Sequence, residues 1–105
     1  MPLSEIEELK NSFVGELVPK KIYLFGSFAE GTQTPDSDFD FYIVVDDSEK
    51  DVLGLTAKAY RSIRHKQNRP VDIIVNTEKT FSDRSSYISS VEREVLQKGV
   101  LLYGA

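Results

Sequence analysis

The 105-residue chain contains no cysteine, which excludes disulfide bonds and thiolate metal sites. Its single histidine, His65, argues against a nucleophilic mechanism that depends on a histidine base. The longest apolar runs are far shorter than the ~20 residues that cross a bilayer, and the first ten residues are too acidic and polar for a secretion signal. Basic residues number 13 against 17 acidic ones, and the net charge of −4 disfavours nucleic acid as the main partner. A cytoplasmic protein that binds no membrane is expected.

Apolar spacing and turn signals divide the chain into helices and strands of a single domain, residues 1–105. The expected elements are a helix 4–17, a strand 21–25, a helical turn and loop 26–37, a strand 39–45, a helix 48–68, a strand 71–75, a loosely helical region after 77, a helix 86–98 and a strand 100–103. This alternation predicts an α+β fold in which helices flank a small mixed β-sheet.

The helices have recognisable ends and apolar faces. Ser4 and the SEKD box at 48–51 are candidate N-caps, and Gly99 is a candidate helix stop. The side chains expected to point into the core are Ile6, Leu9, Phe13 and Leu17 in the first helix and Ile88, Val91 and Val95 in the last.

Three aspartates lie in segments that otherwise read as strands, where aspartate is disfavoured. Asp38 and Asp40 are two residues apart, so both side chains leave the strand on one side. Asp72 would face the same site if its strand lies beside theirs. Carboxylates without cysteine suit Mg²⁺ or Mn²⁺, either one ion or two. Such a centre can orient a hydroxyl for phosphoryl displacement, with Asp72 helping to deprotonate it.

The pair Gly26-Ser27 follows the first strand and precedes a short helical turn. A glycine lets a phosphate approach the backbone, and Ser27 would lie at the positive end of that turn. Each feature alone has a structural explanation: a turn for Gly-Ser, a solvated loop for the aspartate pair, and an edge strand for Asp72. Their combination favours a site.

The pattern of Gly-Ser, a loop, Ser-Asp-x-Asp in a strand and a later strand aspartate resembles the nucleotidyltransferase superfamily that includes DNA polymerase β. The layout is similar to its minimal nucleotidyltransferase (MNT) branch over nearly the whole chain, including the tail EREVLQKGVLLYG. The resemblance implies the nucleotidyltransferase fold, nucleotide binding by Gly26 and Ser27, and catalytic, metal-binding roles for Asp38, Asp40 and Asp72. Related sequences often read Gly-Ser-x-Ala-Arg-Gly, whereas Glu30 replaces that arginine here.

The resemblance further implies a metal-dependent enzyme that transfers a nucleoside monophosphate, typically AMP from ATP, to a hydroxyl. Many minimal members are antitoxins of small helical HEPN proteins, and a partner or a second copy is expected to present the acceptor. The alternatives are an inactive docking antitoxin or a nucleotide-binding regulatory subunit.

Several other residues have less specific interpretations. Phe13, Val14 or Tyr87 could face a partner. The basic run 60–69 is more simply a solvated helix face, and Tyr42 more simply a core residue than a base-stacking one.

Overall fold

The computed structural model describes residues 3–104. Its elements, in chain order, are α1 (Leu3–Leu17), β1 (Lys21–Phe25), α2 (Ser27–Glu30), β2 (Phe39–Val45), α3 (Val52–Ser62), β3 (Val71–Thr77), α4 (Glu78–Ser85), α5 (Val91–Lys98) and β4 (Val100–Tyr103). Among these helices none is both long and apolar enough to cross a membrane.

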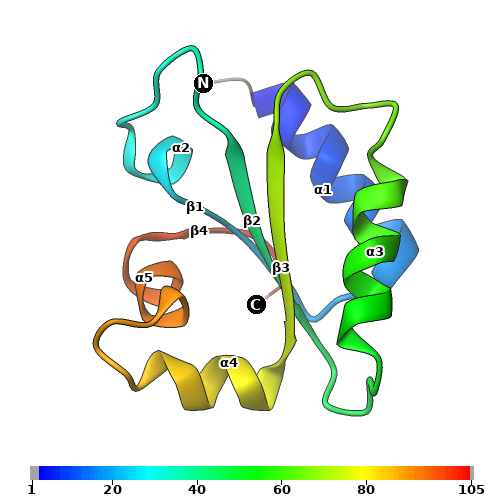
Figure 1. Ribbon diagram of the computed structural model, residues 1–105, viewed down its shortest axis with the longest axis vertical. Coiled ribbons are helices and arrows are strands. Elements are labelled where there is room, and N and C mark those ends of the chain that lie inside the picture. Colours follow the sequence, from blue (N-terminus) through cyan, green and yellow to red (C-terminus); the bar gives the residue numbers. More distant parts are fainter. Residues whose placement is uncertain (1–2, 105) are drawn as a thin grey trace.

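The four strands form one mixed sheet in the order β3-β2-β1-β4. β1 runs antiparallel to both β2 and β4, whereas β2 and β3 are parallel. Figure 1 shows α1 and α3 on one side of the sheet, and α2, α4 and α5 on the other. The predicted α+β architecture, a small mixed sheet flanked by helices, is therefore confirmed.

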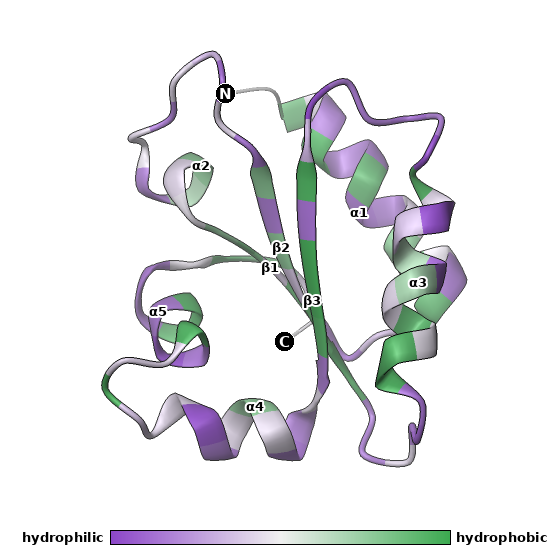
Figure 2. Cartoon of the chain, viewed as in Figure 1, coloured by the Kyte–Doolittle hydropathy of each residue, from purple (hydrophilic) through white to green (hydrophobic). Residues whose placement is uncertain are grey.

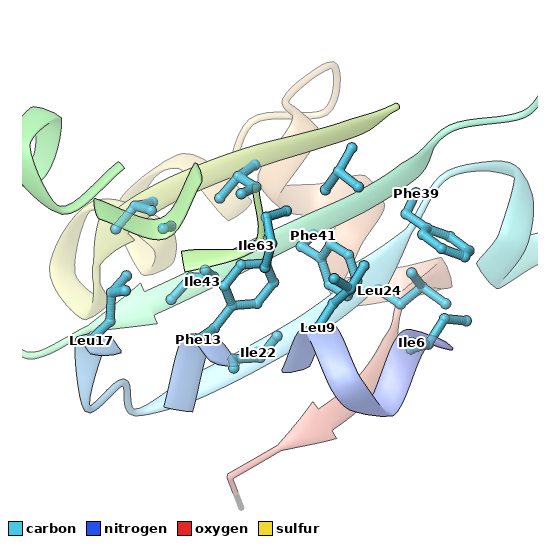
Figure 3. Packing of buried hydrophobic residues seen from close by; sticks show 14 of the residues in the cluster. Ile6, Leu9, Phe13, Leu17, Ile22, Leu24, Phe39, Phe41, Ile43 and Ile63 are labelled. Atoms are coloured by element: carbon cyan, nitrogen blue, oxygen red, sulfur yellow. The ribbon is translucent and has the colours of Figure 1, made fainter. Parts of the chain in front are cut away.

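The larger hydrophobic core lies between the sheet and the α1–α3 layer (Figure 3). The predicted apolar stripe of α1 is fully embedded in it, and the rings of Phe13 and Phe41 meet edge to face with centroids 5.1 Å apart. Phe13 has no exposed surface, so the prediction that it could face a partner is wrong; Tyr87 remains 66% exposed.

A smaller core occupies the opposite face, where Tyr23, Tyr42, Val44, Phe81 and Val95 pack together. Tyr42 is completely buried there, as expected of a core residue. Figure 2 shows that β2 and β3, although largely hydrophobic, carry hydrophilic bands toward the end of the sheet that is nearest α2. This end of the second face is where the aspartates lie.

The helix predicted over 48–68 is shorter at both ends. It begins after Asp51, whose carboxylate accepts a hydrogen bond from the N–H of Gly54, so Asp51 rather than Ser48 is the N-cap. Ser48 instead donates its N–H to Asp46 in a turn. The helix ends at Ser62 because Ile63 leaves helical geometry as its side chain enters the core. The basic residues that follow lie in turns and not on one helix face.

The last helix also starts later than predicted. Ser90 caps it by accepting a hydrogen bond from the N–H of Arg93, so residues 86–90 precede the helix as turns. Consequently Ile88 is 89% exposed and Val91 42% exposed, and only Val95 points inward as predicted.

Candidate functional site

The sheet brings the predicted aspartates to one end of one face. In the parallel pairing of β2 with β3, Asp40 stands directly opposite Asp72, and Asp38 lies one residue before β2 begins. Asp38 and Asp40 are partly buried, whereas Asp72 is exposed. The two strand ends are adjacent because a parallel pair aligns its N-terminal ends at one edge of the sheet.

Negative charge accumulates around Asp40. The pKa of Asp40 is raised from 3.8 to about 6, most of all by burial and then by the nearby carboxylates of Asp72, Asp38 and Glu94, in that order. A hydrogen-bonding interaction with the side chain of Asp72 adds a smaller upward effect on the pKa of Asp40. The negative charges of this cluster repel one another, so the cluster attracts a cation electrostatically.

The Gly26-Ser27 corner lies against the same cluster. Phe25 pairs with Asp40 across β1 and β2, and Gly26 then turns the chain into α2 with φ 75° and ψ −157°, a conformation that is accessible essentially only to glycine. A Cβ atom at Gly26 would collide with Oδ2 of Asp40. The backbone at Gly26 is thus bare and close to a site carboxylate, and Ser27 begins the helix beside it.

These donors fit a magnesium ion of the kind that also binds a nucleotide. Mg²⁺ is usually bound by one or two carboxylates together with substrate phosphates and water. Within residues 3–104, no group of three or more His, Asp or Glu side chains is arranged closely enough to hold a metal ion by itself. Asp40 and Asp72, with Asp38 near them, match the open arrangement that leaves positions for phosphate oxygens.

Arg69 packs against the segments that carry the candidate site residues, and this role was not predicted from the sequence. Its guanidinium carbon lies 4.9 Å from the ring centroids of both Phe28 and Phe39, and its Nη1 donates to the carbonyl of Ser37 at 3.4 Å. It therefore connects α2, next to Ser27, with the segment that carries Asp38. The only feature of the sequence that points to this role is the position of the arginine, immediately before Pro70 and the strand that follows.

Helix α5 was likewise missed as a site element. Tyr42 donates a 2.7 Å hydrogen bond to the buried carboxylate of Glu92, and Asn76 donates to the same Tyr42 hydroxyl at 3.0 Å. Burial, together with the hydrogen bond to Glu92, raises the pKa of Tyr42 strongly. This network holds α5 on the sheet. Glu94 lies one helical turn after Ser90, toward Gly99, and its carboxylate is near enough to Asp40 to raise the pKa of Asp40.

Two of the hollows in the molecular surface lie away from the aspartates. One hollow of about 470 Å³ lies between α1 and Lys66, and another of about 250 Å³ runs along α5 past Glu94 and Lys98. Neither of these two hollows is lined by Asp38, Asp40 or Asp72. Asp72 itself is exposed, so a group on another molecule can approach it.

Comparison with known proteins agrees with this geometry. Residues 6–102 match the nucleotidyltransferase domain family. A protein of Methanocaldococcus jannaschii, assigned provisionally as a protein adenylyltransferase, is 35% identical over 93% of this chain and 90% of its own.

Two solved structures are similar over nearly the whole chain. The crystal structure of a toxin–antitoxin with AMP-PNP superposes with a TM-score of 0.58 at 23% identity, covering 100% of this chain and 75% of that one. A provisionally assigned nucleotidyltransferase from Sulfolobus solfataricus gives 0.57 at 26% identity, covering 96% and 75%.

Proposed function

This chain belongs to the nucleotidyltransferase domain family, and on that premise we propose that it transfers AMP from ATP to a hydroxyl group of a partner protein. The hydroxyl oxygen would bond to the α-phosphorus as the bond to the β-phosphate breaks, so pyrophosphate leaves and the hydroxyl proton passes to a carboxylate. The observation that carries the proposal is the placement of Asp40 opposite Asp72, with the bare backbone of Gly26 against Asp40. The reaction needs carboxylates for the metal and the attacking hydroxyl, and a place where the phosphates of the nucleotide can bind, all within one small area. The geometry at this end of the sheet is consistent with both needs.

Each residue has a distinct role in this reaction. Asp38, Asp40 and Asp72 would hold Mg²⁺, which when bound offsets the negative charge on the phosphates. Gly26 leaves room for a phosphate to approach the main chain, and Ser27 offers its hydroxyl and N–H to phosphate oxygens. Asp72, the exposed member of the cluster, is positioned to accept the proton of an incoming hydroxyl.

The acceptor that we favour is a tyrosine hydroxyl of a small helical HEPN-type toxin, which would make this chain an antitoxin. Two findings support a protein acceptor: the 35% identical relative is assigned provisionally as a protein adenylyltransferase, and Asp72 is exposed, so a side chain of another molecule can approach it. The similarity of fold to a toxin–antitoxin structure solved with AMP-PNP is consistent with this role.

The test is a transfer assay with α-labelled ATP, Mg²⁺ and the product of the neighbouring gene. We expect label on the partner, its loss when Mg²⁺ is chelated, and its loss in a double Asp38→Ala, Asp40→Ala variant. Mapping the labelled residue by mass spectrometry identifies the acceptor. If the two proteins associate tightly but no nucleotide moves from any NTP, the enzyme proposal is wrong and a docking role is favoured.

A further inference from the structure

Glu30 is an unexpected residue so close to a phosphate seat. It lies one helical turn after Ser27, where its charge would repel a nucleotide. The structure gives it a counter-charge: Nζ of Lys98, at the end of α5, is 3.9 Å from Oε1 of Glu30. A residue more than 60 positions away in the chain therefore restores positive charge next to the Gly-Ser corner.

The pairing of β4 with β1 brings Lys98 to this end of the sheet. β1 and β4 are antiparallel, with Leu24 opposite Val100, so α5, which ends two residues before Val100, ends beside the C-terminal end of β1. The intervening Gly99 makes this possible, because a Cβ there would overlap the carbonyl of Val95 and lie 3.2 Å from that of Leu24. The end of α5 is held directly against the end of β1.

The side of α5 that carries Lys98 also faces the aspartates. Glu94 and Lys98 are four residues apart, so they lie on one side of the helix. Glu94 is near enough to Asp40 to act on its charge, and Lys98 contacts Glu30. Lys98 therefore lies on the side of α5 that faces Asp40 and also contacts α2, the short helix that begins at Ser27.

We propose that Lys98 binds the triphosphate of the nucleotide, and that Glu30 holds it ready by an ion pair that phosphate oxygens replace. The inference rests on the proposed function, since it assigns a further contact to the same substrate. It goes beyond the Gly-Ser and aspartate pattern by adding a residue of α5.

The exchange is favourable on electrostatic grounds. The side chains of Lys98 and Glu30 are 61% and 34% exposed, and ion pairs with that much exposure contribute little to stability because water and salt screen them. A triphosphate carries several charges and offers shorter, charge-assisted hydrogen bonds to an ammonium group. Releasing Glu30 therefore costs less than the phosphate contact returns.

The variants Lys98→Gln and Glu30→Gln test the proposal, because both remove the ion pair but they change the phosphate seat in opposite ways. Calorimetric titration with Mg-ATP, with magnesium tripolyphosphate and with AMP measures which part of the ligand is involved. Lys58→Gln, on the far helix layer, is the matched control that removes the same charge from an exposed lysine.

We expect Lys98→Gln to weaken Mg-ATP and tripolyphosphate binding by about tenfold, to leave AMP binding unchanged, and Glu30→Gln to tighten Mg-ATP by about two- to fivefold. Lys58→Gln should have no effect on any of the three. Unchanged affinity in Lys98→Gln overturns the inference while the enzyme proposal stands. Lys98-dependent binding without label transfer supports the inference and overturns the enzyme proposal. A wild-type protein that binds no Mg-ATP overturns both.

Discussion

Replacing Asp40 by asparagine should stabilise the metal-free protein, although it removes the residue at the centre of the site. The substitution keeps the shape of the side chain and deletes its charge. Burial and the carboxylates of Asp72, Asp38 and Glu94 all oppose ionisation of Asp40, so the folded protein holds that proton more tightly than the unfolded chain does. Above the folded pKa the wild-type protein must carry an unfavourable charge, and the variant does not.

The size of the gain follows from the pKa of Asp40, which rises from 3.8 to about 6. Since a tenfold change in proton affinity is worth about 1.4 kcal/mol, the full cost is about 3 kcal/mol. The carboxylate is only half-buried, so solvent screening reduces the expected gain to about 1–2 kcal/mol. For a domain of this size that corresponds to a melting temperature higher by about 5–10 °C.

The direction of the pKa shift of Asp40 determines how the stability depends on pH. A raised pKa gives the wild-type protein its full relative stability below pH 3.8 and loses it as the pH rises through about 6. Urea unfolding of both proteins in a chelating buffer should therefore show a variant that is more stable at pH 8, and more stable by only about a third as much at pH 4.5. With Mg²⁺ in excess the difference in stability between the variant and the wild-type protein should become smaller, because the ion stabilises only a folded state that binds it.

An exposed loop residue provides the control: Asp36→Asn removes the same charge outside the cluster and should leave stability unchanged at both pH values. If Asp40→Asn is no more stable than wild type at pH 8, or equally more stable at pH 4.5, the described crowding of carboxylates is not a property of the folded protein.

Three further substitutions test the surrounding structure. Gly26→Ala should cost about 1–3 kcal/mol in urea unfolding and abolish label transfer, because the new methyl group occupies the place of the facing carboxylate. Tyr42→Phe should cost about 1–3 kcal/mol, since it removes the hydrogen bond to the buried Glu92; the cost should shrink in a Glu92→Gln background. Asp51→Ala should lower stability by about 1 kcal/mol, and Ser48→Ala should not, because only Asp51 caps α3; thermal melts distinguish the two.

The strands and the aspartates could be predicted from the sequence because both depend on local patterns. Strand β2 has the predicted bounds, since hydrophobic alternation and the preceding polar loop define it completely. Asp38, Asp40 and Asp72 stood out because aspartate is costly in a strand unless something compensates it. Their proximity was conditional on strand order, which depends on pairing between distant segments.

The parts that could not be predicted depend on such distant pairings. Arg69 is recognisable as a support only when Phe28 and Phe39 are known to enclose it. The neutralisation of Glu30 requires the β1–β4 register that brings Lys98 to the Gly-Ser corner. The start of α5 was misplaced for a local reason: serines at several neighbouring positions can all cap a helix, and the structure uses Ser90.

One face of the sheet contributes most of the stability, and the other face carries the candidate site. The α1–α3 face carries the larger hydrophobic core, with buried side chains from both helices and from three strands. The opposite face has a small core, a buried carboxylate and, at its end, three aspartates that repel one another. Because the first face supplies most of the apolar burial, the second can hold charges that reduce stability. This separation explains why hydrophobic periodicity locates the core, whereas the site is found where that periodicity is broken.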